Sequence, residues 1–171
     1  VCLTLVLAGC SGPQVRDYAA EQPRLELSEY FNGELEAWGM FQNRSGEVIK
    51  RFHVAMTGTW EGDTGVLDER FTYSDGSKER RVWTLKRQAD GSWRGTAGDV
   101  VGEAVGEVAG NALNWRYTLR LPVDGTTYDV QFDDWMYQMD GRVMLNRARM
   151  SKWGFYLGEV TLSFYKKVAL D

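Results

Sequence analysis

Long stretches of the chain alternate apolar and polar residues with a period of two, the pattern of a strand with one buried face. Between residues 50 and 60 the apolar face carries Phe52, Val54, Met56, Gly58 and Trp60. Two later stretches repeat the pattern, one with Trp115, Tyr117, Leu119 and Leu121 and one with Tyr156, Val160, Leu162 and Phe164. We therefore expect an all-β protein whose strands share one core.

Turn-forming residues separate these stretches. They occur at residues 43–46, 75–76, 90–91, 110–111, 124–125 and 140–141, as combinations of Gly with Asp or Asn. Such pairs supply the positive φ angles of tight hairpins, so about ten strands follow one another with short connections. A long antiparallel meander exposes two edges unless it closes on itself. We expect residues 25–171 to form a single domain, an antiparallel up-and-down β-barrel of about ten strands with a short helical turn within Leu25–Phe31.

One predicted strand, at residues 128–138, breaks its own alternation. Its first half places Tyr128, Val130 and Phe132 on one face, and its second half places Trp135, Tyr137 and Met139 on the other. A bulge at Asp133-Asp134 would reset the alternation. Alternatively, the strand is regular and both of its faces are partly covered.

The N-terminal stretch VCLTLVLAGCSG is apolar, uncharged and too short to cross a bilayer, which takes roughly 20 residues. It fits the apolar region of an export signal whose charged start precedes Val1, so we interpret residues 1–9 as a signal-peptide remnant. Leu7-Ala8-Gly9-Cys10 resembles a bacterial lipobox, which implies that Cys10 is lipidated and that residues 10–24 form a tether. Ser11 after the cysteine resembles the outer-membrane sorting pattern, which implies a lipid-anchored protein of the bacterial cell envelope that faces the periplasm.

Composition narrows the function further. After cleavage Cys10 would be the only cysteine, because Cys2 leaves with the signal, so the mature monomer would hold no disulfide. The net charge of −4 is mild and the signs are interspersed, which argues against a nucleic-acid partner. The only expected membrane contact is the acyl anchor.

The chain carries few groups suited to catalysis. His53 is the single histidine, and the alternation places it on the polar face of its strand. Hydrolase, phosphate-loop and zinc motifs do not occur. Asp133 and Asp134 are adjacent and read as surface or turn carboxylates. We therefore expect no catalytic residues, no metal site and no cofactor.

Four charged residues share faces with apolar residues and are the candidate ligand-binding residues. Glu69 alternates with Leu67 and Phe71, and Arg81 alternates with Trp83 and Leu85. Arg147 and Arg149 alternate with Val143 and Leu145. In one interpretation they form a polar end to an apolar cavity, where an arginine holds a carboxylate or phosphate head group. In the other, Glu69 and the arginines pair with each other or reach solvent.

The helical turn followed by Gly33-Glu34-Leu35-Glu36-Ala37-Trp38 and a hairpin meander resembles the opening of the lipocalins, members of the calycin superfamily. The segments LSEYFNGELEAWGMFQNRSG and FTYSDGSKERRVWTLKR are similar to a family of uncharacterised proteobacterial lipoproteins that carries only a domain of unknown function. The resemblance implies a barrel-like, periplasm-facing lipoprotein and supplies no activity.

Together these features predict a non-enzymatic binder or carrier of an apolar small molecule, such as a fatty acid or lipid. The alternative is a structural or interaction lipoprotein whose barrel is filled by its own side chains and which acts through unknown protein partners in the envelope.

Overall fold

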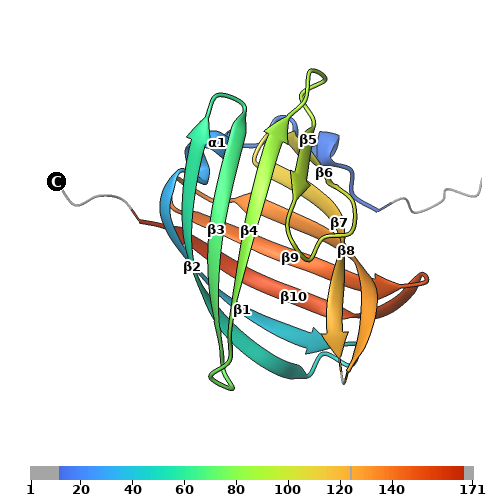
Figure 1. The fold of residues 1–171 in the computed structure, drawn as a ribbon. Coiled ribbons are helices and arrows are strands. Elements are labelled where there is room, and N and C mark those ends of the chain that lie inside the picture. Colours follow the sequence, from blue (N-terminus) through green and yellow to red (C-terminus); the bar gives the residue numbers. More distant parts are fainter. Residues whose placement is uncertain (1–11, 124, 168–171) are drawn as a thin grey trace, which may run out of the picture.

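The computed structural model describes residues 12–123 and 125–167. Within them ten antiparallel strands form a closed barrel, in which each strand pairs with its neighbours in sequence and the last strand pairs with the first (Figure 1). The closing pair runs from Leu35 opposite Lys166 to Asn43 opposite Gly158. The predicted all-β, up-and-down barrel of about ten strands is confirmed.

In the part of the chain that the structure describes, two short helices precede the barrel, η1 at Val15–Tyr18 and α1 at Leu27–Tyr30. None of the described helices is long and apolar enough to span a bilayer. The strands are β1 (Gly33–Asn43), β2 (Val48–Glu61), β3 (Thr64–Tyr73), β4 (Lys78–Arg87), β5 (Trp93–Thr96), β6 (Ala104–Ala109), β7 (Ala112–Val123), β8 (Thr126–Gln138), β9 (Val143–Lys152) and β10 (Phe155–Lys166).

Helix α1, the predicted helical turn, lies at one end of the barrel (Figure 1). Its apolar residues and those beside it are buried, including Leu27, Tyr30 and Phe31. The Nε1 of Trp60 donates a hydrogen bond to the carbonyl oxygen of Phe31 at 3.1 Å. Gly58 permits this approach, because a Cβ at that position would lie 1.6 Å from the same oxygen. Trp60, near the C-terminal end of β2, thus holds the α1 segment at this end of the barrel.

Strand β8 is regular, so the bulge interpretation of residues 128–138 is wrong. Its pairing with β7 and β9 shows no register shift. Val130, Phe132 and Asp134 therefore all face the interior and are buried. The alternation breaks in the sequence because the outer face is also covered, by Tyr18 of η1, whose ring lies 5.2 Å from that of Tyr137. The outer face of the second half of β8 is apolar because it packs against η1.

The described part of the expected tether lies on the barrel. Besides Tyr18, whose ring contacts Trp135 as well, the backbone N–H of Leu25 donates to the carbonyl oxygen of Gly110 at 2.8 Å. Residues 12–24 are thus packed in part against β6, β7 and β8. The predicted signal remnant at residues 1–9 and the predicted lipidation site at Cys10 lie outside the described residues.

The predicted register of β9 is wrong by one residue. Arg147 and Arg149 face outward with Leu145, whereas the buried residues of this strand are Met144, Asn146, Ala148 and Met150. Both faces of β9 carry apolar residues, so the alternation alone does not show which face is buried. Asn146 lies on the buried face, and its polar side chain makes that face look exposed in the sequence.

Candidate functional site

The barrel encloses a cavity of about 200 Å³. Such a volume exceeds the roughly 150 Å³ that suffices to bind benzene in an engineered apolar cavity. It is smaller than the roughly 300–1,000 Å³ of most sites for drug-sized ligands. The cavity therefore suits a compact molecule or one end of a longer one.

One side of the cavity is apolar. Strands β1, β2 and β10, with α1 at the end, contribute aromatic and aliphatic side chains, among them Phe31, Phe41, Phe52, Met56, Val160, Leu162 and Phe164. These residues occupy every second position of their strands, so the period-two pattern of the sequence produces this surface directly. Burying an apolar ligand here gains roughly 25 cal/mol per Å² of surface removed from water.

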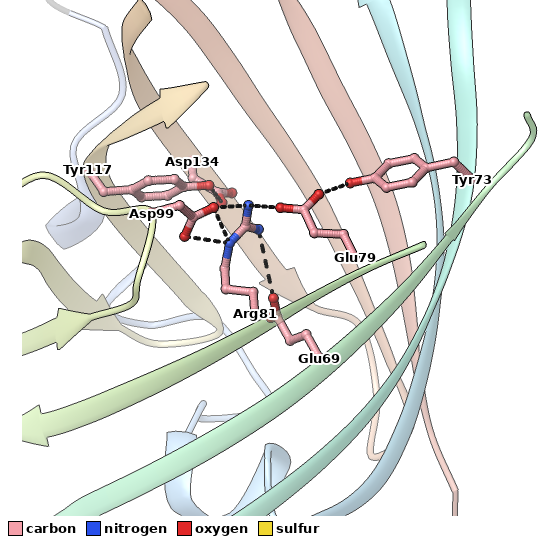
Figure 2. Close-up of polar contacts among 7 residues, drawn as sticks. All are labelled: Glu69, Tyr73, Glu79, Arg81, Asp99, Tyr117 and Asp134. Carbon is pink, nitrogen blue, oxygen red and sulfur yellow. Dashed lines mark hydrogen bonds and ion pairs between the residues drawn. The ribbon is translucent and has the colours of Figure 1, made fainter. Parts of the chain in front are cut away.

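The opposite side, from β3, β4, β7 and β8, carries charged and polar groups around Arg81 (Figure 2). Asp99, in the loop between β5 and β6, accepts hydrogen bonds from Nε and Nη2 of Arg81 at 2.9 and 2.6 Å. Glu69 and Glu79 lie 3.9 and 4.0 Å from the same guanidinium. Burial disfavours the charged guanidinium, but the Asp99 hydrogen bonds and the nearby carboxylates outweigh it and raise the pKa of Arg81.

Asp134 forms the second part of this polar side. Its carboxylate accepts hydrogen bonds from Nδ2 of Asn146 and from the hydroxyl of Tyr117, the latter at 3.2 Å. Burial raises the pKa of Asp134 to about 7, although both hydrogen bonds oppose the change. Burial and the neighbouring Asp134 carboxylate also raise the pKa of Tyr117 well above its ordinary value. Tyr117 therefore stays a neutral hydrogen-bond donor.

Glu69 lines the cavity without a hydrogen-bond partner among the described residues. Its side chain is 12% exposed, and its nearest cation is Arg81, at 3.9 Å. Burial raises the pKa of Glu69 to about 7, and Arg81 only partly offsets this effect. A buried carboxyl group with unused acceptor atoms is costly unless it is protonated or meets a ligand.

The acidic groups form a path from the surface to the interior. Exposure of the side chains falls from 45% at Glu79 through 25% at Asp99 to 12% at Glu69. At the outer end the hydroxyl of Tyr73 donates a 2.7 Å hydrogen bond to Glu79, and Tyr73 has a raised pKa because of burial and this carboxylate. Of the described residues that line the cavity, Arg81 is the one with a positive charge, against three with carboxyl groups.

The structure brings together two of the four candidate ligand-binding residues. Glu69 and Arg81 lie inside the barrel, as their alternation predicts, and they approach each other. Arg147 lies on the outer surface, where Glu159 accepts its hydrogen bonds at 2.7 and 2.9 Å. Arg149, also outside, lies 4.8 Å from the ring of Tyr156. The two outer arginines therefore do not belong to the cavity.

Asp134 is an interior residue that sequence analysis assigned to the surface. The available signal was its spacing from Val130 and Phe132, which continues the inner face of β8 without interruption. Glu79 could have been found in the same way, since it lies two residues before Arg81. Asp99 carries no such signal, because it belongs to a loop.

Other chemistry-bearing groups lie elsewhere. His53 is on the outer face of β2, where its Nε2 lies 3.8 Å from Glu36. Among residues 12–123 and 125–167, no group of three or more His, Cys, Asp or Glu side chains is placed to hold a metal ion. A second hollow, of about 550 Å³, lies around Trp38, His53 and Leu145 on the outer wall and is open to solvent.

The chain matches a protein family by sequence and is similar to solved structures in fold. A family model described as "Protein of unknown function (DUF3833)" matches residues 4–166. No curated protein sequence matches the chain at a significant level.

The structure of the S-type phycobiliprotein lyase CPES from Guillardia theta is similar to this structure, with a TM-score of 0.57 and 10% sequence identity, over 92% of this chain and 100% of that chain. The structure of EF1p2_mFAP2b bound to DFHBI has a TM-score of 0.46 and 12% identity, over 89% of this chain and 99% of that chain. At 10% identity, the likeness to the lyase establishes a lipocalin-like barrel fold and no function.

Proposed function

The chain belongs to the family described as protein of unknown function DUF3833, and we propose that it binds one small, largely apolar molecule inside its barrel without transforming it. The observation that supports this proposal is the cavity of about 200 Å³ with one apolar and one polar side. Ligand sites in proteins have this composition, in which apolar walls supply affinity and a few polar groups orient the ligand.

The alternative proposal is an interaction module whose barrel is filled by its own side chains. That rival requires the inward aromatic residues to pack against one another throughout. Trp83 does pack against Trp115 and Tyr117, and Tyr117 stacks on Phe132. Space nevertheless remains inside the barrel. Native cores contain few voids larger than a water molecule, so a cavity of this size supports a ligand-binding interior over a filled one.

An acyl chain of a lipid or fatty acid is one ligand of the proposed class, because the apolar wall accommodates its hydrocarbon. The sequence suggested a free arginine for the polar end of such a ligand, but the structure places carboxylates around Arg81. Arg81 is already paired with Asp99 and flanked by Glu69 and Glu79. A free carboxylate there would lie among like charges, which is unfavourable in a buried site. The hydrocarbon chain of such a ligand fits the cavity, whereas an anionic head group does not.

The proposal is tested on the full purified chain with hexan-1-ol, a neutral probe small enough for the cavity. Binding is followed by NMR shifts of the methyl groups of Met56, Leu67 and Leu113, which line the cavity. We expect saturable shifts at these methyls. Native mass spectrometry and solvent extraction of the same preparation would identify any molecule that co-purifies. Absence of saturable shifts in a folded protein from which no ligand is extracted would contradict the proposal.

A pair of matched variants locates the probe. Ala148→Leu adds bulk to the cavity wall, whereas Ala55→Leu makes the same change on an exposed outward position of β2. We expect the first variant to weaken hexan-1-ol binding at least several-fold and the second to leave it unchanged. Equal weakening, or shifts confined to the outer hollow around Trp38, would place the probe outside the barrel.

We further propose that Cys10 is lipidated and anchors the chain in the bacterial envelope, with the barrel facing the periplasm. The support is the Leu7-Ala8-Gly9-Cys10 motif after an apolar stretch. Incorporation of an alkyne-tagged fatty acid in bacteria tests it, with Cys10→Ala expected to abolish labelling and Cys2→Ala to retain it. Persistent labelling of Cys10→Ala would refute this anchor.

A further inference from the structure

Among the described residues, the cavity lining has more acidic than basic side chains, which favours a positively charged ligand. This inference rests on the proposed function: we infer that the ligand is a small apolar amine or similar organic cation. Its charged nitrogen lies between Glu69 and Asp134, and its apolar body lies against β1, β2 and β10. These two carboxyl groups line the same cavity and come from strands on its polar side.

Arg81, the one cation among the described residues of the cavity lining, is already paired with protein carboxylates. Three donor contacts of Arg81 within 3.0 Å go to Asp99. Glu69 and Glu79 flank the remaining Nη atoms, and the ring of Phe71 lies 5.2 Å from the guanidinium carbon. A ligand carboxylate or phosphate beside this guanidinium would lie among three protein carboxylates, which repel it.

Glu69 is the acceptor that the protein leaves unused. Its side chain is nearly buried, lines the cavity and accepts no hydrogen bond from the described residues. Among the described residues, the fully buried side-chain atoms without a hydrogen-bond partner are Asn111 Oδ1 and Gln138 Oε1, so the Glu69 oxygens border the open volume of the cavity and can be reached by a ligand. A donor on the ligand would satisfy Glu69. A cationic nitrogen would also gain a charge-assisted hydrogen bond, which is stronger than a neutral one.

Asp134 supplies the second acceptor. Tyr117 and Asn146 hold its carboxylate in the wall of the same cavity that Glu69 lines. Two carboxylates that line one cavity repel each other when both are ionised. A cation between them removes that repulsion and offsets the desolvation of the ligand's own charge.

The more exposed acidic groups beside Arg81 extend the negative charge toward the surface. Glu79 is half exposed at the start of β4, and Asp99 is a quarter exposed in the β5–β6 loop. A gradient of negative charge with apolar walls attracts cations and repels anions. The path thus selects for the same charge as the interior.

Proton release accompanies such binding. Burial raises the pKa values of Glu69 and Asp134 to about 7, so both carboxyl groups are partly protonated near neutral pH and must ionise to pair with a cation. The ionisable groups that face them from the surrounding elements are Tyr73, Glu79, Arg81, Asp99 and Tyr117. Affinity for an amine should therefore increase as pH rises through 7, whereas affinity for a neutral probe should not.

The test compares hexylamine, hexan-1-ol and hexanoate, which share one hydrocarbon chain and differ in charge, by isothermal titration calorimetry of the full chain at about pH 8, above both raised pKa values. We expect hexylamine to bind about tenfold or more tightly than hexan-1-ol, the gain of one charge-assisted hydrogen bond. Hexanoate should bind most weakly. Equal affinity for hexylamine and hexan-1-ol would overturn the inference while leaving the proposed function intact, whereas failure of all three probes would overturn both.

Adjacent residues of β3 supply a matched pair of variants. Glu69→Gln removes the charge inside the barrel and keeps the shape of the side chain. Asp68→Asn removes the charge of the preceding residue, which pairs with Arg70 and Arg80 on the outer face. We expect Glu69→Gln to lower hexylamine affinity about tenfold, to leave hexan-1-ol affinity unchanged and to flatten the dependence on pH. Asp68→Asn should change none of the three. If Glu69→Gln leaves the preference for hexylamine intact, Glu69 does not hold the cation and the inference fails.

Discussion

Asp99 accepts two hydrogen bonds from Arg81 within 2.9 Å, and this pair joins a loop to a strand where the barrel wall has no complete strand pairing. Strand β5 pairs with β4 only from Thr84 to Arg87. The loop residue Val100 bridges to Leu119 of β7 on its other side. The ion pair therefore links β4 to β7 through the loop and at the same time directs Arg81 into the cavity.

Arg81→Met should destabilise the protein strongly. It would leave the carboxylates of Asp99 and Glu69 without their cation, and breaking one partner of a buried ion pair typically costs about 3–5 kcal/mol. Urea unfolding measures the change. Arg80→Met, the neighbouring variant on the exposed face, should leave the free energy of unfolding nearly unchanged. A similar effect of both variants would mean that the Arg81–Asp99 pair contributes no special stability.

The stability of the protein should fall as pH rises from about 4 to about 7. Glu69 and Asp134 have ordinary pKa values of 4.5 and 3.8, and both rise to about 7 in the folded protein. Between these values the folded state keeps protons that the unfolded chain has released, so the free energy of unfolding has a negative slope with pH. The contribution is fully present below the ordinary values and lost above about 7.

Urea midpoints measured across this range in wild type and in a Glu69→Gln, Asp134→Asn double variant check that expectation. The amides cannot ionise, so the double variant should show a flatter profile. Asp68 and Asp75 have lowered pKa values, from hydrogen bonds to Arg80 and Ser77 respectively, and act only at lower pH. An unchanged slope in the double variant would show that other groups cause the dependence.

Trp153→Asn should stabilise the protein by about 1 kcal/mol, because a left-handed conformation costs roughly 1–2 kcal/mol for most residues and less for Asn. Trp153 has a φ of +51° in the turn between β9 and β10, and Gly154 follows with +80°. Asn-Gly is the pair that such turns favour. Thermal unfolding measures the gain. Phe155→Asn, an exposed neighbour without a positive φ, should not stabilise.

Tyr18→Ala should lower the free energy of unfolding by about 1–3 kcal/mol, because it removes two aromatic contacts in addition to buried apolar surface. The ring of Tyr18 packs against Trp135 and Tyr137 on the outer face of β8. Tyr18→Phe keeps the ring and removes only the hydroxyl, which lies 3.3 Å from that of Tyr137, so its effect should be smaller. Urea unfolding that finds Tyr18→Ala neutral would place the N-terminal segment apart from the barrel in solution.

Part of the candidate site can be predicted from sequence. Glu69 lies between Leu67 and Phe71 on one face of its strand, and Arg81 precedes Trp83 and Leu85 on one face of β4. The alternation therefore assigns both residues to the interior. The same argument fails for Arg147 and Arg149, because β9 has apolar residues on both faces. It fails for Asp134 because Tyr18 covers the outside of β8 and makes the outer face resemble a core.

The sequence by itself determined the strands, the hairpin turns and the closed barrel. These follow from local rules, because the side-chain period of a strand is two and Gly with Asp or Asn permits tight turns. Only the tertiary structure decided the charge of the cavity. Arg81 is neutralised by Asp99, which is 18 residues away in a loop, and Asp134 is added from β8. Which charges meet inside a barrel depends on register and loop path, and a single residue of register moves a side chain from the interior to solvent.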